Sequence, residues 1–403
     1  MRILVVNNIY PPVVVGGYEV ECHDIVEHLR EQHEVTVLTS VRGAGEAPGE
    51  REVLRRLPFV PYSRRSVLES PLHAVRAVRV MRSTLAEVRP DLVYVWNGAQ
   101  LPYAALRVAE CSGVPLAFRV CEHWFGGMYR SDLFLGRLLP GGRGLWGAWS
   151  RVVRLANRHP ELRFELERTS RVAVCWNAEA VRDATPVPPT MRAAHEALIY
   201  PANSRVDAFA GIERRPPADP PRLIFVGRLD ALKGAEVAIR ALALLRERHG
   251  LPATLLLAGD GPRRAELLAL AQELGVAEHV DLPGPLRGDA LFDAVSAASA
   301  WIIPSVWAEP APLVCTEAAL SRVPAVLSRV GGIGEMLHEE EHALFFDKGD
   351  HVGCAAALAR TLADPAATAA RVDRAFDRGK ELSFEPYLVA MDRFLEEAVA
   401  ALR

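Results

Sequence analysis

The feature that most constrains this chain is a regular alternation between short apolar runs and longer amphipathic stretches. Continuous apolar runs of strand length are typical of strands that are covered on both faces, as in parallel sheets. In the first half we predict strands at residues 3–6, 35–38, 92–95, 116–120, 172–174 and 198–200. Helical spacing of apolar residues predicts helices at 18–32 and 71–89. This order favours an α/β fold with a doubly wound parallel sheet.

The alternation begins again after a proline-rich stretch. Residues 211–221 hold four prolines and lack apolar periodicity, so we predict a linker over residues 210–221. Beyond it we predict strands at 223–226, 254–257, 301–303, 325–327 and 344–346. We therefore predict two doubly wound, Rossmann-like domains, residues 1–209 and 222–384, which face each other across a deep cleft. The ligand is expected in that cleft, at the carboxyl ends of the strands.

Composition excludes several classes of protein. The 403 residues carry a net charge of −3, which argues against a broadly cationic nucleic-acid-binding surface. No run approaches the roughly 20 apolar residues that cross a bilayer, and the apolar start of the chain is too short for a signal peptide. The six cysteines form no C-x-x-C pair, so we expect reduced thiols in the cytoplasm, with neither a zinc site nor a disulfide framework.

The strongest chemical motif is SVWAEPAPLVCTE at residues 305–317, which follows a predicted strand. A helix that begins near Pro312 would present free N–H groups and a positive dipole end to a phosphate. Glu309 would lie in the loop before that helix and reach a sugar, while Glu317 inside the helix would accept hydrogen bonds from a diol. For this motif alone, two solvated surface carboxylates are the alternative.

A second motif, FVGRLDALKG at residues 225–234, follows the first predicted strand of the second half. Gly227 permits a close backbone approach, and Arg228 and Lys233 place two cations at the start of a helix. A guanidinium forks onto phosphate oxygens and an ammonium acts as a point charge, so this loop suits a phosphate group. In isolation, the same residues also fit an ordinary basic surface loop.

Three glycine turns after other predicted strands carry weaker signals. Residues 259–262 (GDGP) contain Asp260 and are placed to border a nucleotide base, and residues 330–335 read VGGIGE. Gly16 and Gly17 join the first strand to the first helix and would let backbone N–H groups approach a phosphate or a sugar. This first turn lacks the G-x-G-x-x-G fingerprint, which disfavours a dinucleotide fold of the dehydrogenase kind.

Taken in this order, the segments resemble the retaining glycosyltransferases of family 4, which adopt the two-domain GT-B architecture. The resemblance covers nearly the whole chain, and its specific part lies in the second half: Gly-Arg…Lys-Gly, Gly-Asp-Gly-Pro, E-x7-E and Gly-Gly-x-x-Glu. It implies a first domain on the acceptor side and a second domain that binds the nucleotide-sugar donor. It also implies that a final helix within residues 385–403 packs back on the first domain.

The resemblance assigns roles to individual residues. It implies that Arg228 and Lys233 hold the donor diphosphate, that Glu317 binds the ribose hydroxyls, and that Glu309 contacts the transferred sugar near its C3 hydroxyl. The other donor-binding residues that it implies are Gly16, Gly17, Gly227, Asp260, Gly284, Pro285, Leu313 and Val314. Of these, Leu313 and Val314 would offer N–H groups to the distal phosphate, and Gly16 and Gly17 would face that phosphate. The Gly-Pro pair matches the loop that flanks the base only loosely.

Two positions depart from the family pattern. The family often has a His-Asp-x-Trp segment whose histidine reaches the sugar or the acceptor, but here Cys121 stands in the place of that histidine. Either His123, beside Trp124, substitutes from a shifted position, or the enzyme works without this contact; we include His123 among the candidate catalytic residues. Pro312 stands where the family often has glycine, so its nitrogen has no hydrogen to donate to a phosphate.

The predicted reaction moves a sugar from a nucleoside diphosphate, UDP or GDP by family frequency, to a hydroxyl acceptor with retention of configuration. Stabilisation of the leaving diphosphate is expected to be the largest catalytic contribution. Because two cations and a helix end supply it, and because no Asp-x-Asp motif lies in a matching loop, we expect neither a metal ion nor a tightly bound cofactor. A glycan, a lipid-linked glycan and a small metabolite all stay open as acceptors, and no nucleic-acid partner is expected.

Three other functions stay open. A GT-B-fold sugar-nucleotide epimerase would share the phosphate site, and it would convert the donor alone into its epimer. A non-catalytic sugar-nucleotide-binding protein would explain Cys121, and it would bind the donor without transfer. The arginines and aromatic residues of 130–171, which include Phe134, leave a membrane-surface protein as a third alternative. A peripheral contact with the inner face of the membrane is also compatible with the enzyme.

Overall fold

The computed structural model describes residues 1–42, 52–61, 63–132, 135, 145–156, 158, 169–216 and 218–403. The chain divides into two compact units. The first unit contains Met1–Ile199 together with Leu388–Arg403, and the second contains Tyr200–Tyr387. Along the chain the units are therefore joined at Ile199/Tyr200 and Tyr387/Leu388, whereas the sequence predicted domain limits at residues 209 and 384.

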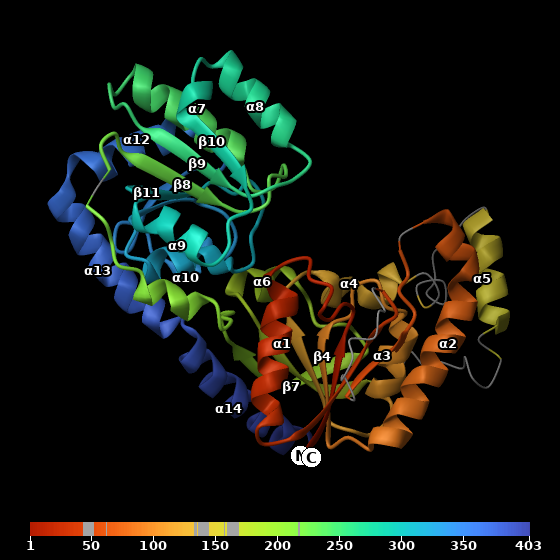
Figure 1. Ribbon diagram of the computed structural model, residues 1–403. Coiled ribbons are helices and arrows are strands. Elements are labelled where there is room, and N and C mark those ends of the chain that lie inside the picture. Colours follow the sequence, from red (N-terminus) through yellow and green to blue (C-terminus); the bar gives the residue numbers. More distant parts are fainter. Residues whose placement is uncertain are drawn as a thin grey trace. The chain divides into compact units, whose positions relative to one another are not determined.

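The first unit is built on a parallel sheet of seven strands in the order β3-β2-β1-β4-β5-β6-β7 (Figure 1). A sheet that begins in the middle and grows first to one edge and then to the other is doubly wound. Its strands are β1 (Arg2–Asn7), β2 (Glu34–Ser40), β3 (Val53–Leu57), β4 (Leu92–Asn97), β5 (Leu116–Val120), β6 (Ser170–Trp176) and β7 (Met191–Leu198). Its helices are α1 (Gly17–Arg30), α2 (Arg64–Val88), α3 (Tyr103–Glu110), α4 (Trp124–Ser131), α5 (Leu145–Ala156), α6 (Glu179–Ala184) and most of α14 (Phe384–Leu402).

The second unit repeats the plan with a parallel sheet of six strands in the order β10-β9-β8-β11-β12-β13. Its strands are β8 (Arg222–Val226), β9 (Thr254–Ala258), β10 (Val280–Gly284), β11 (Ala300–Ile303), β12 (Ala325–Ser328) and β13 (Leu344–Phe346). Its α-helices are α7 (Ala235–Glu247), α8 (Arg264–Glu273), α9 (Asp289–Ser296), α10 (Leu313–Leu320), α11 (Ile333–Met336), α12 (His351–Ala363) and α13 (Pro365–Glu381). Two 3₁₀ helices complete it, η2 (Val206–Gly211) and η3 (Ala277–His279).

Both faces of the second sheet are covered. Successive side chains of a strand point to opposite faces, and Leu223 and Leu255 belong to a buried cluster that also contains the apolar sides of α7, α8 and α12. On the other face, the ring of Trp301 lies 6.2 Å from that of Phe209 in η2, which lies 5.3 Å from Phe292 of α9. The sheet is therefore buried between helices, and its carboxyl edge is the place where loops carry function.

The sequence predicted the central strands and the edge strand β13, and it missed or misplaced the other three edge strands. The strands β3 and β10, each at one end of its sheet, were not predicted, and the strand expected at 198–200 is β7, which runs from Met191 to Leu198. These edge strands read VLRRL, VDLPG and MRAAHEAL, with polar residues inside them. An edge strand has one neighbour instead of two, so it need not be a continuous apolar run.

One helix start was also misplaced. The sequence predicted that the second helix begins at Pro71, but α2 begins at Arg64 and contains this proline. Its N-terminus is set by Ser63, whose hydroxyl oxygen accepts a hydrogen bond from the N–H of Ser66 at 3.1 Å. This is the usual geometry of a serine N-cap. A cap therefore marks the start of this helix better than its proline does.

The C-terminal helix α14 packs on the first unit from Leu388 onward. Two histidine–carboxylate pairs accompany its apolar side: Asp392 lies 2.9 Å from Nε2 of His28, and Glu397 lies 3.3 Å from Nε2 of His195. The first pair joins α14 to α1, and the second joins it to β7. The end of the chain is thus part of the first sheet's helical cover.

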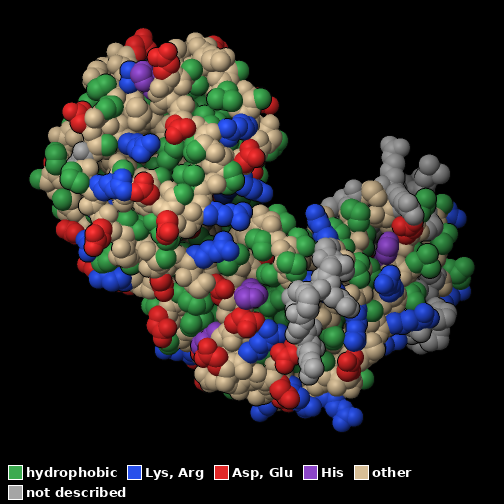
Figure 2. Space-filling model, in the orientation of Figure 1, with side chains coloured by type: hydrophobic (Ala, Val, Ile, Leu, Met, Phe, Trp, Pro, Cys, Tyr) green, Lys and Arg blue, Asp and Glu red, His purple; other side chains and the backbone are tan. Residues whose placement is uncertain are grey.

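The surface bears on the membrane alternative. In the part of the chain that the structure describes, no helix has both the length and the apolar character needed to cross a bilayer. On the face drawn in Figure 2, basic and acidic side chains are interspersed over both units. Of the segment 130–171, the structure describes α5 and little more, and Phe134 lies outside the described residues. Peripheral membrane contact stays a prediction.

Candidate functional site

Glycine turns at the carboxyl ends of β8 and β9 pack backbone against backbone. The N–H of Gly227 donates to the carbonyl of Ala258 at 3.1 Å, and the N–H of Leu229 donates to the carbonyl of Asp260 at 2.9 Å. A Cβ atom at Gly259 would overlap the carbonyl group of Gly227. These two turns must therefore be nearly bare backbone, which leaves their outer surface open to a ligand.

The loop that carries Lys233 is fixed to the loop after β11. Gly234 has a φ of +67°, and a Cβ atom there would overlap the carbonyl group of Pro304. Directly beside this contact, the N–H of Val306 donates to the carbonyl of Leu232 at 2.9 Å. The two motifs that the sequence singled out, residues 225–234 and 305–317, are consequently one structural unit.

Glu309 lies at the centre of this unit and is buried, with 4% of its surface exposed. Its Oε1 atom lies 2.6 Å from Nζ of Lys233 and accepts a hydrogen bond from Oγ of Ser305, also at 2.6 Å. The backbone is held as well, because the N–H of Gly332 donates to the carbonyl of Glu309 at 2.8 Å. The Gly-Gly-x-x-Glu turn approaches so closely that a Cβ atom at Gly331 would overlap the same carbonyl group.

Arg228 differs from Lys233 in its exposure. Its side chain is 57% exposed, and its guanidinium lies 3.0 Å from Oδ2 of Asp230. The other carboxylate oxygen of Asp230 accepts hydrogen bonds from the N–H groups of Leu232 and Lys233, at 2.9 and 3.1 Å. Asp230 thus shapes the loop and orients Arg228, whose charge faces solvent while the charge of Lys233 lies against Glu309.

Helix α10 begins where the sequence predicted, with Leu313 after an N-cap at Pro312. Its first turn contains no acidic residue, and no side chain in the described parts of the chain caps it. Leu313 and Val314 are half-buried, so the free N–H groups of this helix end lie near the surface. The positive end of the helix is therefore available to an anion.

Glu317 follows in the second turn of α10 and is half-buried. Desolvation raises the pKa of its carboxyl to about 7, and the positive charge of Arg205 opposes this rise. In the described parts of the chain its carboxylate takes part in no hydrogen bond or ion pair. Burial also raises the pKa of the neighbouring Cys315 thiol, so that this cysteine is an inert packing group.

Two residues near this site were missed by sequence reasoning. Ser305 bonds Glu309 directly, and Arg205, just before η2, carries the charge that acts on Glu317. Ser305 lies inside the 305–317 motif, and its position four residues before Glu309 could have indicated a contact between the two side chains. Arg205 lies more than a hundred residues before Glu317 in the chain, and no local pattern marks it.

The other predicted donor residues of the second unit lie at the same edge of its sheet. Gly284 ends β10 opposite Ala258 of β9 and has a φ of +95°. Pro285 and Asp260 are exposed beside it. The second unit thus gathers its predicted donor residues at the carboxyl ends of adjacent strands, as a doubly wound sheet requires.

The candidate residues of the first unit have a different environment. The N–H of Gly16 donates to Oε2 of Glu19 at 2.8 Å, and Gly17 is the first residue of α1. Cys121 is buried, which raises the pKa of its thiol, whereas His123 is exposed and its Nδ1 lies 2.8 Å from the hydroxyl of Thr185. These residues belong to the other compact unit, so their approach to the donor site stays a prediction.

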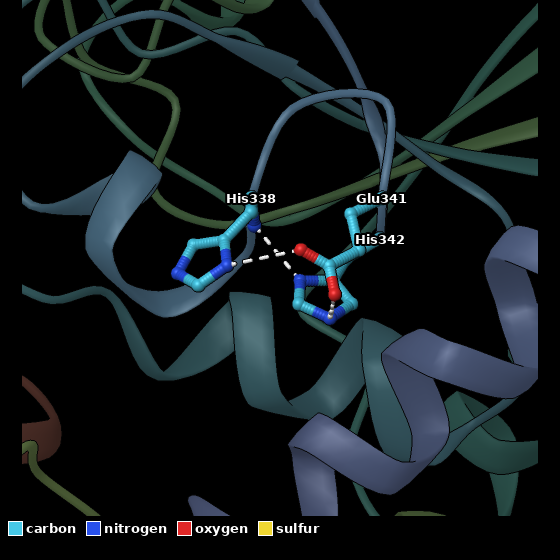
Figure 3. A group of neighbouring side chains, drawn as sticks. All are labelled: His338, Glu341 and His342. Atoms are coloured by element: carbon cyan, nitrogen blue, oxygen red, sulfur yellow. Dashed lines mark hydrogen bonds and ion pairs between the residues drawn. The ribbon is translucent and has the colours of Figure 1, made fainter.

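In the described ranges, one group of side chains has the composition of a metal site: His338, Glu341 and His342, in the loop between α11 and β13 (Figure 3). Oxygens of Glu341 lie 3.4 Å from Nδ1 of His338 and 3.7 Å from Nε2 of His342. However, the N–H of His338 donates to Nδ1 of His342 at 2.9 Å, so the neutral ring of His342 carries its proton on Nε2. A metal ion bound at Nε2 would move the ring proton to Nδ1, which could then no longer accept the bond from His338. The buried His342 is therefore explained by its hydrogen bond to the backbone, which stabilises the loop.

Most of the chain is similar to known glycosyltransferase families. The profile of Glycosyl transferases group 1 matches residues 212–378, and that of Glycosyltransferase Family 4 matches residues 15–180. The glycogen synthase of Mycobacterium tuberculosis is 36% identical over 405 residues, which cover 94% of this chain and 90% of that protein.

Solved structures share the fold at low sequence identity. Sucrose-phosphate synthase from Thermosynechococcus elongatus has a TM-score of 0.69 and 20% identity over 99% of each chain. Anabaena Alr3699/HepE in complex with UDP has a TM-score of 0.67 and 20% identity over 98% of this chain and 100% of that chain. Together with the two doubly wound sheets, these neighbours show that the fold is that of the GT-B class of glycosyltransferases. By its full-length similarity to a curated relative and its two profile matches, the chain belongs to glycosyltransferase family 4.

Proposed function

We propose that this protein is a retaining, metal-independent glycosyltransferase that moves a sugar from a nucleoside-diphosphate sugar to a hydroxyl acceptor. The observation that carries the proposal is the joining of Lys233 to the buried Glu309 in the loop before the uncapped end of α10. In this proposal the second unit binds the donor and the first unit binds the acceptor. The site needs no metal ion, because its charge comes from the chain itself.

The leaving group is the chemical problem that these residues address. When the bond between the anomeric carbon and the diphosphate oxygen breaks, negative charge develops on the diphosphate while the sugar becomes oxocarbenium-like. Lys233, Arg228 and the N–H groups of Leu313 and Val314 stabilise that charge in the proposed mechanism. Because the donors are fixed before the reaction, little reorganisation is needed as the charge appears.

Retention follows if the acceptor attacks from the face that the diphosphate leaves. A new bond then forms between the acceptor oxygen and the anomeric carbon, and the acceptor's proton passes to a phosphate oxygen of the leaving group. Glu309 positions the sugar in this scheme through a hydroxyl near C3 and forms no covalent bond. Glu317 accepts hydrogen bonds from the ribose hydroxyls of the donor.

Two comparisons support the choice of substrates. A protein of the same fold is solved in complex with UDP, which supports a uridine nucleotide, with GDP as the other candidate. The full-length relative is named for glycogen synthesis, which supports a glycan acceptor ahead of a lipid-linked glycan or a small metabolite. We place the reaction in the cytoplasm, where nucleotide sugars are made.

Thermal unfolding with a panel of nucleoside diphosphates tests the donor site. The matching diphosphate raises the melting temperature in proportion to the logarithm of its concentration, and the others have little effect. NMR of the product made from the matching sugar donor is expected to show the donor's anomeric configuration, with the same rate in EDTA. Inversion, a requirement for added metal ions, or epimerised donor in the absence of acceptor would each contradict the proposal.

A further inference from the structure

Ser305 occupies a position that the proposed chemistry has not used. It follows β11 and is buried, with 2% of its surface exposed. Its hydroxyl donates to Oε1 of Glu309 at 2.6 Å, within a loop that is turned by a hydrogen bond from the N–H of Glu309 to the carbonyl of Trp307 at 2.8 Å. A short hydrogen bond to a carboxylate is among the stronger ones in proteins.

Both protein donors to this carboxylate converge on one oxygen. Nζ of Lys233 and Oγ of Ser305 each lie 2.6 Å from Oε1 of Glu309. An ionised carboxylate oxygen has about two favourable acceptor directions, so these two donors fill Oε1. In the described parts of the chain, Oε2 has no donor. The free acceptor capacity of Glu309 is therefore concentrated on one oxygen.

The serine is itself held in place. Its carbonyl oxygen accepts a hydrogen bond from the hydroxyl of Ser328, at the end of β12, at 2.8 Å. The next residue, Val306, is bonded to the loop of Lys233 through Leu232. The backbone at Ser305 is thus held by the end of β12 and by the loop after β8, whereas Lys233 reaches Glu309 at the end of a long flexible side chain.

We propose that Ser305 is a positioning residue for glycosyl transfer: it fixes Oε1 of Glu309 and thereby presents Oε2 to the transferred sugar. This inference rests on the proposed function. Without the hydroxyl, the carboxylate turns about its side-chain bonds to follow the ammonium of Lys233, and Oε2 loses its fixed direction. The effect falls on the sugar and not on the nucleotide, because Glu309 contacts the sugar alone in the proposed mechanism.

The test compares Ser305→Ala with Ser321→Ala. Ser321 is equally buried at the far end of α10 and donates to the carbonyl of Ala318 at 2.8 Å, so it controls for the loss of a buried hydroxyl. Ser305→Ala is expected to lower kcat about tenfold or more, the range for one hydrogen bond to a charged group. Its affinity for free UDP or GDP, measured by calorimetry, is expected to match that of wild type and of Ser321→Ala, because the free nucleotide lacks the sugar.

A double-mutant cycle separates positioning from general damage. Glu309→Gln and Ser305→Ala/Glu309→Gln are expected to be equally slow, because the serine acts through the carboxylate. Ser305→Thr, which keeps the hydroxyl, is expected to recover most of the rate. Additive losses in the cycle, or equal weakening of free nucleotide binding, would overturn the role of Ser305.

The outcomes also distinguish this inference from the proposed function. If Glu309→Gln transfers sugar at the wild-type rate, the proposed function loses its sugar-positioning residue. If Glu309→Gln is slow and Ser305→Ala is as fast as Ser321→Ala, only the role of Ser305 is wrong. Circular dichroism and thermal unfolding report on the folding of every variant, so weaker nucleotide binding by a folded Ser305→Ala counts against the role of Ser305.

Discussion

The two units each place a helix N-terminus after a strand, and the two ends differ in charge. At the start of α1, the carboxylate of Glu19 accepts hydrogen bonds from the N–H groups of Gly16 and Val15, at 2.8 and 3.3 Å. At the start of α10, the N-cap is Pro312, the first turn holds no acidic residue, and no described side chain caps the free N–H groups.

This difference shows that a helix end is not an anion site by geometry alone. The end of α1 already has a negative partner, so a phosphate there would meet a carboxylate as well as the helix dipole. The end of α10 has none, and Lys233 and Arg228 share its sheet edge. The electrostatics therefore favour a diphosphate in the second unit, and the glycines of the first unit are better suited to a neutral sugar or a hydroxyl.

The largest test of this contrast is Lys233→Ala. It removes the proposed phosphate cation and also leaves Glu309 buried without its ionic partner. We expect turnover at saturating donor to fall by on the order of tenfold to a thousandfold, and Arg228→Ala to fall toward the lower end of that range because Arg228 is exposed. Initial-rate assays measure both, with the exposed Lys348→Ala as the control for loss of a lysine. If both site variants transfer sugar at the wild-type rate, the diphosphate does not bind at Lys233 and Arg228.

The backbone packing of the second unit gives the next largest effect. Gly234→Ala places a methyl group against the carbonyl of Pro304, whereas Gly250, with a nearly identical φ of +64°, has open space around it. Both variants bear the cost of a left-handed alanine, so their difference isolates the clash. We expect Gly234→Ala to unfold with about 2 kcal/mol less free energy than Gly250→Ala, measured in urea. Equal values would mean that the two loops are not held together as described.

The raised pKa of Glu317, in the α10 helix of the second unit, predicts a pH dependence of the free energy of unfolding. Its pKa of about 7 in the folded protein exceeds its ordinary value of 4.5, so the folded protein keeps a proton that the unfolded chain releases. The free energy of unfolding is therefore expected to fall as pH rises from 4.5 to about 7 and to level off above it. Glu317→Gln lacks this slope, and urea titrations of both proteins across that range check it.

The same residue tests the nucleotide contact. Glu317→Gln is expected to weaken UDP or GDP binding about tenfold, because a charged acceptor of the ribose hydroxyls is lost. Inorganic pyrophosphate has no ribose, so its binding is expected to be unchanged. If pyrophosphate weakens to the same degree, Glu317 acts on the phosphates instead.

The smallest effect is expected at the other helix end. Glu19→Ala removes the partner of Gly16 and of the α1 dipole, which is expected to lower the free energy of unfolding by about 1 kcal/mol. Glu31→Ala, an exposed residue at the far end of the same helix, is the control. Nucleotide affinity is expected to stay at the wild-type value. Tighter binding in Glu19→Ala would show that the end of α1 also receives the phosphate once this carboxylate is removed, and the contrast between the units would then fail.

The central architecture could be predicted because its signals are local. Buried parallel strands are continuous apolar runs, and the α10 motif, which follows such a run, holds two prolines and two glutamates within thirteen residues, 305–317. The confirmed start of α10 at Leu313 follows from such a short-range pattern. The family resemblance, which the comparisons confirmed, could also be recognised locally, because each of its specific motifs is a short segment after one strand of the second sheet.

What could not be predicted depends on neighbours distant in the chain. The edge strands β3, β7 and β10 are defined by their pairing and not by their composition. Arg205 reaches Glu317 only through the fold, and the direction of the Ser305 hydroxyl depends on the loop conformation. The contact between Glu19 and Gly16 is an exception, because these residues are only three apart in the chain. A glutamate at N3 of a helix is a known capping signal, but the sequence analysis considered only the glycines of this turn.

The division of the chain also determines how it can be taken apart. The second unit is one uninterrupted stretch, Tyr200–Tyr387, so a gene fragment can encode it whole. The first unit is assembled from two stretches that the second unit separates along the chain. In the intact chain, the rings of Tyr94 and Phe394 lie 6.4 Å apart. A protein truncated after Ile199 would lack Phe394 and would expose the apolar surface that α14 covers. Supplying residues 388–403 as a separate peptide, or fusing them to the truncated end, is the route to a soluble first half.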